Sequence, residues 1–249
     1  MNISLILPCY NETANIQKGA LDKVGNFTKN NSYFGEVIIV DDGSTDDSKK
    51  TIKEKYLPLF PKFQLIENKH SGKAFAIIGG IEKATGDYIM FCDMDLATPI
   101  EEAAQLIKAA NGGSEIIIGS RNSRREGAPF TRKLMALGMI FIREYFITLR
   151  GIKDTQCGFK LFQTAAARNI IQKLLVFKKH HAVSGSSVSA GFDLEFLFLA
   201  KKLGYEITEI PVTWKHVETK NVTFIKSSMD SLKDILLIKY YDATHRYKT

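Results

Sequence analysis

The chain has 249 residues, of which 45% are hydrophobic and 24% are charged. This composition excludes a disordered chain, and the length suits one α/β domain with a buried core. The net charge of +7 favours anionic partners such as nucleotides, phosphate groups or an acidic membrane surface, although a solvated lysine-rich surface explains it equally well.

Cysteine usage and the N-terminal sequence predict a cytoplasmic protein. Cys9, Cys92 and Cys157 form no paired motif, and an odd count indicates buried thiols in a reducing compartment. The first residues enter a strand at once and lack the basic start of a secretory signal. No apolar run reaches the roughly 20 residues that cross a bilayer. We therefore expect at most a peripheral position at the cytoplasmic face of a membrane.

In the first half of the chain, short apolar runs alternate with helical patterns. The expected strands are residues 3–7, 37–40, 63–66, 88–92 and 116–118, and the expected helices are 13–27, 46–56, 72–84 and 100–110. Runs that are apolar on both faces suit a parallel sheet covered by helices on each side. The alternation predicts a Rossmann-like α/β fold with a mostly parallel central sheet.

The second half is predicted to continue the same domain. Its expected elements are an apolar helix at 131–149, a strand at 156–162, a mobile loop at 184–191, a helix at 192–203, a strand at 207–212 and a helix at 224–243. Since neither an internal repeat nor a linker interrupts the chain, we expect one domain over residues 1–249.

Acidic residues gather where the predicted strands end. Glu12 follows the first strand, Asp41 and Asp42 end the second, and Asp93 and Asp95 follow the fourth. Ligands of open parallel sheets bind at this edge. Two aspartates in an Asp-x-Asp pattern can share Mg²⁺ or Mn²⁺, which take carboxylate oxygens together with substrate phosphates.

Several segments, in chain order, resemble glycosyltransferase family 2 with the GT-A fold. They are 8–12 (PCYNE), 40–46 (VDDGSTD), 72–74 (GKA), 93–95 (DMD) and 119–121 (GSR). The later segments 151–162 (GIKDTQCGFKLF), 192–195 (FDLE) and 209–214 (EIPVTW) are similar to the dolichyl-phosphate β-glucosyltransferases. The resemblance covers residues 3 to about 240. It implies an inverting hexosyltransferase with a nucleotide-sugar donor and a polyprenyl- or dolichyl-phosphate acceptor.

The resemblance also assigns roles to individual residues. The nucleotide would be bound by Pro8, Tyr10, Glu12, Asp41, Asp42, Lys73 and Asp93, and the metal by Asp93 and Asp95. The acceptor would meet Arg121, Gln156 and Lys160, and Arg132 is added to them as part of a basic loop that could bind the acceptor phosphate. Apart from the resemblance, a hydroxyl acceptor would need a general base, for which Asp154 and Asp193 are the candidates, and Arg121 is the third candidate catalytic residue. An acid at a helix N-terminus explains Asp193 equally well. Residues 1–120 would form the nucleotide-sugar half and 121–249 the acceptor half.

Other functions stay open. UDP-glucose is the expected donor, with GDP-mannose or a saccharide hydroxyl acceptor as alternatives within the family. A nucleotidyltransferase would need a basic glycine-rich loop after the first strand, where residues 8–12 are acidic instead. A non-catalytic relative that binds lipid or a partner is disfavoured by the intact Asp93 and Asp95. We expect no nucleic-acid partner.

A basic segment suggests how a lipid acceptor could be reached. Arg121, Arg124, Arg125, Arg132 and Lys133 precede or begin the apolar helix at 131–149. The segment could bind anionic lipid headgroups while the helix lies in the membrane interface. The same helix could equally belong to the core or to the surface of a homo-oligomer.

Overall fold

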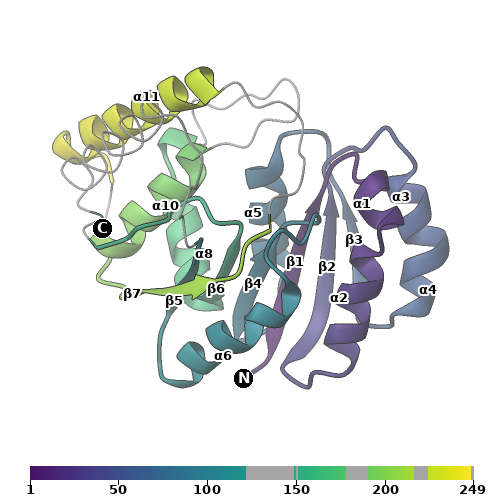
Figure 1. Cartoon of the computed structure of the whole chain (residues 1–249). Coiled ribbons are helices and arrows are strands. Elements are labelled where there is room, and N and C mark those ends of the chain that lie inside the picture. The colour runs from purple at the N-terminus through teal and green to yellow at the C-terminus, as the bar shows by residue number, and fades with distance from the viewer. Residues whose placement is uncertain (122–148, 150, 178–189, 216–223, 248–249) are drawn as a thin grey trace.

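The computed structural model describes residues 1–121, 149, 151–177, 190–215 and 224–247 (Figure 1). The strands of this part of the chain are β1 (Ile3–Cys9), β2 (Phe34–Asp41), β3 (Phe63–Glu67), β4 (Tyr88–Cys92), β5 (Ile116–Arg121), β6 (Phe159–Gln163) and β7 (Ile207–Val212). The longer helices are α2 (Ala20–Lys29), α5 (Lys73–Lys83), α6 (Ala103–Asn111), α8 (Thr164–Lys173), α10 (Ala190–Lys202) and α11 (Phe224–Ala243). Shorter helical segments are α1 (Thr13–Gln17), α3 (Ser48–Thr51), η1 (Ile52–Tyr56), α4 (Leu57–Leu59) and η2 (Ile100–Glu102).

The described strands form one sheet in the order β3-β2-β1-β4-β6-β5-β7. β6 runs antiparallel to both of its neighbours, β4 and β5. All other paired strands are parallel. The predicted α/β fold with a mostly parallel central sheet is therefore confirmed, with one reversed strand in its second half.

Helices cover both faces of the sheet, as predicted, and each face has its own core (Figure 1). Successive strand residues point to opposite faces, so Ile6 belongs to one core and Leu5 and Leu7 belong to the other. The first core is closed by α5, α8, α10 and α11. The second is closed by α2, η1 and α6. Burial on both faces explains why the strand sequences read as continuous apolar runs.

The predicted helix at 13–27 is wrong as a single element. The structure has α1 and α2 instead, and they are separated at Lys18 and Gly19. Gly19 has φ +82°, a left-handed conformation that glycine adopts without steric cost and that ends a helix. The second predicted helix, 46–56, starts later and runs on as α3, η1 and α4 to Leu59.

In the second half of the chain, two predicted elements have other bounds in the structure and a third lies outside the described residues. The predicted strand at 156–162 is β6, shifted to Phe159–Gln163, and α8 follows it without having been predicted. The predicted loop at 184–191 is wrong at its end, because α10 already begins at Ala190. The expected helix at 131–149 lies outside the described residues except for Leu149. None of the described helices is long and apolar enough to cross a membrane.

Candidate active site

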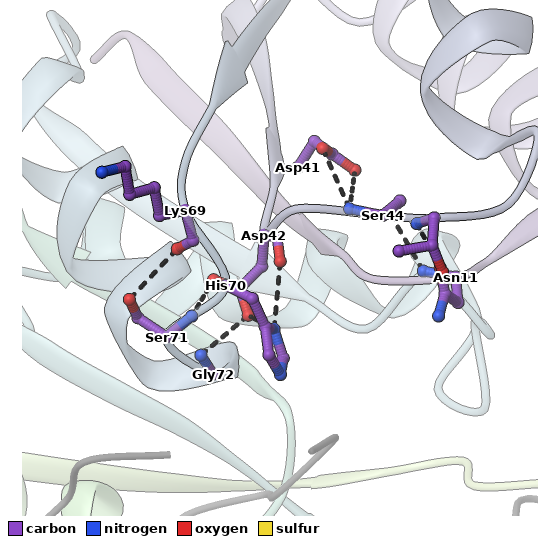
Figure 2. A network of polar contacts seen from close by, with 9 residues as sticks. Asn11, Asp41, Asp42, Ser44, Lys69, His70, Ser71 and Gly72 are labelled. Carbon is purple, nitrogen blue, oxygen red and sulfur yellow. Dashed lines mark hydrogen bonds and ion pairs between the residues drawn. The ribbon is translucent and has the colours of Figure 1, made fainter. Parts of the chain in front are cut away.

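The carboxyl end of β2 leads into a polar network around Asp42 (Figure 2). The Asp42 side chain is buried and accepts hydrogen bonds from the main-chain N–H groups of Ser71, at 2.9 Å, and Gly72, at 2.7 Å. Its Oδ2 also lies 2.8 Å from Nδ1 of His70. Asp42 therefore fixes the loop before α5, besides its predicted place near the nucleotide.

His70 is the functional candidate that sequence reasoning missed. Its ring stacks on Tyr10, with 4.1 Å between ring centroids and an interplanar angle of 15°. Nδ1 lies near two acceptors, the carboxylate and the carbonyl oxygen of Asp42, so the ring hydrogen on that side belongs to Nδ1. The stacked rings place an aromatic surface at the strand-end edge, where a nucleobase could lie.

Asn11 and Asp41 bind the loops after β1 and β2 to each other. Asn11 has φ +54°, which asparagine tolerates better than most residues. Its N–H donates to Oγ of Ser44 at 3.0 Å, and its Oδ1 accepts from the N–H of Thr45 at 2.8 Å. The buried Asp41 carboxylate accepts from the N–H of Ser44 at 3.2 Å (Figure 2). These contacts give Asp41 a structural role at the predicted nucleotide edge.

Pro8 and Glu12 lie on either side of this turn. Pro8 is buried in β1 beside Val40, beyond the point where the pairing of β1 with β4 ends at Ile6. Its missing N–H therefore interrupts no hydrogen bond to β4. Glu12 is partly exposed and accepts a hydrogen bond from Asn15. The nucleotide roles of both residues stay predictions.

The predicted metal ligands follow β4 in a tight turn. Asp93 forms an ion pair with Lys73, the first residue of α5. Oδ1 of Asp93 is buried, and it meets the Lys73 ammonium without receiving a hydrogen bond from any other group. Asp95 accepts a hydrogen bond from the N–H of Ala97 at 3.0 Å. Leu96, the residue after Asp95, has φ +48°. This backbone conformation is strained for leucine, and such strain is found most often at functional sites.

The charges of this turn are strongly coupled. Loss of hydration lowers the pKa of Lys73, but the Asp93 carboxylate more than offsets this and holds the pKa above its usual value. Burial raises the pKa of Asp95, and the nearby charge of Asp93 adds to the effect. A cation bound by both carboxylates would stabilise their charged forms.

The residues present fit a hard divalent cation. Asp93 offers a buried oxygen without a hydrogen-bond donor, and Asp95 offers a second carboxylate. No group of three His, Cys, Asp or Glu side chains suited to a metal occurs among the described residues. Mg²⁺ is commonly held by one or two carboxylates plus substrate phosphates and water, which is the donor set available here.

Gly158 lies directly against the Asp93 carboxylate. A Cβ at this position would overlap the carboxylate atoms, so only glycine leaves the space that Asp93 occupies. Gly158 precedes β6, the reversed strand that lies beside β4. The contact therefore joins the segment around Cys157 to the predicted metal site.

Next to β4, Lys160 and Asp193 form a partly buried ion pair. Lys160 lies in β6 and is 1% exposed, and its ammonium pairs with Asp193 in the first turn of α10. The same ammonium lies 5.2 Å from the centroid of the Phe91 ring. The pair places one positive and one negative group beside Asp93 and Lys73, as Coulombic contacts of Lys73 with both Asp93 and Asp193 indicate.

Arg121 and Asp154 form a second pair at the end of β5. Nε and one terminal nitrogen of Arg121 donate to the two Asp154 oxygens at 2.6 and 2.9 Å. Burial would raise the pKa of Asp154, but the hydrogen bonds and charge of Arg121 outweigh it and lower that pKa. Glu209 of β7 accepts the N–H of Asp154 at 2.8 Å, and the Arg121 guanidinium lies 5.8 Å from the Trp214 ring. The geometry suits Asp154 to orienting Arg121.

One small pocket joins the two sides of the site. Its lining residues are Lys73, Ala74, Ile77, Phe91, Gln156, Gly158, Phe192 and Asp193. It thus brings together Lys73 from the predicted nucleotide half with Gln156 and Asp193 from the predicted acceptor half. Arg132 and the neighbouring basic residues lie outside the described part of the chain.

Comparisons with known proteins identify the family of the chain. The family model described as Glycosyl transferase family 2 matches residues 4–171. A dolichyl-phosphate β-glucosyltransferase of Trichomonas vaginalis is 31% identical over 249 residues, which cover 93% of this chain and 72% of the relative. A dolichol-phosphate mannosyltransferase of Pyrococcus furiosus is 34% identical over 166 residues, which cover 64% of this chain and 45% of the relative.

The fold is also that of a solved enzyme. Glucosyl-3-phosphoglycerate synthase of Mycobacterium tuberculosis, in complex with Mn²⁺, uridine diphosphate and glucosyl-3-phosphoglycerate, superposes with a TM-score of 0.64 at 16% identity. The match covers 96% of this chain and 80% of that chain. At this identity the likeness establishes the GT-A fold alone.

Proposed function

Because the chain belongs to glycosyltransferase family 2, we propose that it transfers a hexose from a nucleotide diphosphate sugar to a polyprenyl-phosphate acceptor. The pocket lined by Lys73 and Asp193 carries the proposal, because Lys73 pairs with Asp93 on the proposed donor side and Asp193 pairs with Lys160 on the proposed acceptor side. In this proposal residues 1–120 supply the donor side and 121–249 the acceptor side.

UDP-glucose is the proposed donor. The relative named for glucose matches 93% of this chain, whereas the relative named for mannose matches 64%. The stacked rings of Tyr10 and His70 would hold the base, and Asp42 would keep His70 and the 70–72 loop in place. Lys73 would face the phosphates once its pairing with Asp93 is released by the bound donor.

Asp93 and Asp95 would hold the divalent cation, which neutralises the charge that builds on the diphosphate leaving group. Lys73 adds a second positive charge on the same side of the pocket. Gly158 keeps the Asp93 carboxylate in position by leaving it space. These groups act by positioning and by fixed charge, and the sugar leaves the donor with inversion at the anomeric carbon.

Lys160 and Gln156 would orient the acceptor phosphate. A phosphate monoester has a second pKa of about 6, so it is already largely ionised at neutral pH and needs little help from a base. Asp193 would then hold Lys160 in place, whereas a hydroxyl acceptor would need Asp193 to take its proton. The proposed role of Asp154 is to orient Arg121.

Ligand-dependent melting tests the donor. With Mn²⁺ present, UDP is expected to raise the melting temperature more than GDP, because a ligand that binds only the folded state stabilises it according to its affinity. The Asp95→Ala variant should lose the part of the shift that depends on Mn²⁺, and the exposed Asp47→Ala variant should keep it. A larger shift with GDP would identify the mannosyl alternative.

Transfer assays test the acceptor. Radiolabelled glucose should move from UDP-glucose to a polyprenyl phosphate and not to free saccharides. The Asp193→Asn variant should lower turnover only moderately with a phosphate acceptor. A loss near 10⁴-fold, the top of the usual range for removal of a general base, would favour a hydroxyl acceptor.

A further inference from the structure

The C-terminal helix α11 is apolar on two opposite faces. Ile235 and Ile238 are buried against the rest of the molecule, at 1% and 0% exposure. Leu236 and Tyr240, one helical turn apart, are each 53% exposed on the outer side. Partly exposed Leu232 extends this outer face. A surface helix needs only one apolar face to pack on its own core. A second, exposed apolar face therefore indicates a surface that binds a partner.

Basic side chains border the outer face. Lys233 and Lys239 are exposed on the same stretch of helix, and the Arg246 guanidinium lies 5.5 Å from the Tyr240 ring. Asp234 is buried, and Asp242 forms ion pairs with Lys202 at 2.7 Å and with Lys239 at 3.7 Å. The face therefore presents leucine and tyrosine side chains with positive charge around them.

The position of α11 links this face to the active site. In Figure 1 the N-terminus lies at the bottom and α11 at the top, on the side toward which β1 runs. Asp234 of α11 lies against Gly191, where a Cβ would overlap its carboxylate. Asp193, which pairs with Lys160, follows two residues later. The outer face is thus held in a fixed relation to the acceptor side of the pocket.

We propose that the outer face of α11, formed by Leu232, Lys233, Leu236, Lys239 and Tyr240, docks on a bilayer that contains anionic lipid. Helices of this kind lie in the interface with leucine and aromatic side chains in the acyl boundary and lysines at the headgroups. The inference rests on the proposed function, because a polyprenyl-phosphate acceptor keeps its tail in a bilayer. It assigns membrane docking to α11, in addition to the basic segment around Arg132.

A second copy of the chain fits this face less well than lipid does. In a two-fold interface the same surface meets itself, so Lys233 and Lys239 of one copy would approach the lysines of the other. Like charges brought together in this way disfavour association. Anionic headgroups complement the same lysines, because their negative charge attracts basic side chains near the surface.

A matched pair of double variants tests the docking surface. The test variant is Leu236→Gln with Tyr240→Gln, and the control is Leu59→Gln with Tyr33→Gln. Leu59 has the same 53% exposure but lies in α4, and Tyr33 is 37% exposed before β2. Binding is measured by co-sedimentation with vesicles of phosphatidylcholine alone and of phosphatidylcholine with phosphatidylserine, at low and high salt.

The wild type and the control are expected to bind the anionic vesicles in a salt-sensitive way. The test variant should bind them about tenfold more weakly or worse, because two apolar side chains no longer enter the interface. Equal binding by the test variant and the wild type would overturn the proposal. A wild type that stays in the supernatant with both kinds of vesicle would also overturn the proposal. The same holds if the wild type and the control are dimers in analytical ultracentrifugation and the test variant is a monomer.

Glucosyl transfer separates this inference from the function on which it rests. With a short, water-soluble polyprenyl phosphate the test variant should retain wild-type turnover, which also shows that it is folded. With a long-chain acceptor in anionic vesicles it should be about tenfold slower. If the wild type, the control and the test variant all fail to transfer glucose to either acceptor, the proposed function is refuted. The vesicle-binding measurement then still decides the role of α11. Equal losses with both acceptors would refute a docking role.

Discussion

At Gly158 the main chain lies against the Asp93 carboxylate, so the addition of one methyl group at this residue tests the position of the carboxylate. A Cβ at Gly158 would overlap Asp93, so Gly158→Ala should displace the carboxylate. Misplacement of a catalytic group by about 1 Å can cost on the order of 10²-fold in rate. We expect kcat/KM to fall by about that factor while the melting temperature changes little.

Gly112→Ala is the matched control for this change. A Cβ there would come no closer than 3.2 Å to another atom, and the site lies at the end of α6, away from Asp93. Its steady-state kinetics should match those of the wild type. If Gly158→Ala also keeps normal kcat/KM, the Asp93 carboxylate has no fixed position in the reaction.

The acidic residues of the site could be foreseen because parallel strands bring their carboxyl ends to one edge. Asp93, Asp95 and Asp42 lie there as expected. The partners of these acids could not be foreseen. His70 stands in a loop with no periodic pattern, and only the fold brings it to Tyr10 and Asp42. A sequence shows which residues carry charge, but not which charges neutralise each other.

At the scale of elements, Glu195 holds the start of α10 against the segment after α8. Its buried carboxylate accepts three main-chain N–H groups and one hydroxyl, from Leu175, Val176, Phe177 and Tyr247, at 2.7 to 2.8 Å. Burial and this carboxylate raise the pKa of Tyr247. Asp193, two residues earlier in the same helix, points toward Lys160 instead.

We predict that Glu195→Ala lowers the free energy of unfolding by about 3–5 kcal/mol, because it leaves several buried donors without an acceptor. For a chain of this length, that corresponds to a fall in melting temperature on the order of 10 °C. Differential scanning calorimetry measures it. Glu206→Ala, on an exposed residue just before β7, should change stability by less than about 0.5 kcal/mol.

Glu36 lies near the amino-terminal end of β2, at the end of the strand away from Asp41 and the candidate active site, and it makes the free energy of unfolding depend on pH. Burial alone would raise its pKa, but hydrogen bonds from Ser4, Thr85 and Gln64 outweigh this and hold the pKa below its usual value. A carboxyl group with a lowered pKa in the folded state stabilises it above the unfolded pKa of about 4.3, and loses that effect as pH falls.

The Glu36→Gln variant should therefore be less stable than the wild type at pH 6, and the difference should shrink as pH falls below about 4. Urea unfolding at pH 6 and at pH 3 to 4 gives both free energies. A difference that stays the same at all pH values would show that the loss comes from packing and not from the carboxylate charge.

Element types were easier to predict from sequence than their boundaries and directions. The apolar runs gave β2, β4 and β7 because buried parallel strands need branched and aromatic side chains on both faces. The break between α1 and α2 was missed because Gly19 fits a helical pattern as well as a turn. The reversal of β6 was missed as well, since a strand has the same alternation in either direction.

At the scale of the whole molecule, the three cysteines report on the unfolding of one core. Cys9, Cys92 and Cys157 are all buried in the core that α2, η1 and α6 close. Burial, with Asp154 nearby, raises the pKa of Cys157 to about 11, and burial also raises the pKa of Cys9 and Cys92. The thiolate is the reactive form of cysteine.

A disulfide reagent should therefore label the native protein very slowly, and denaturant should expose all three thiols in one transition. UDP with Mn²⁺ should slow labelling further, since ligand binding reduces the unfolded fraction. Mass spectrometry after timed labelling counts the modified thiols. Rapid labelling of one cysteine in the native protein would show that this part of the sheet opens by itself.

The place of β6 between β4 and β5 also matters for how the chain is made. β4 pairs with β1 on one side and with β6 on the other, and the ribosome produces β5 and the long segment after it before β6. At about 5–20 residues per second, β4 waits several seconds for its second neighbour. During translation the emerging chain therefore carries the bare edge of an apolar strand, Tyr88–Cys92, which another nascent chain could join.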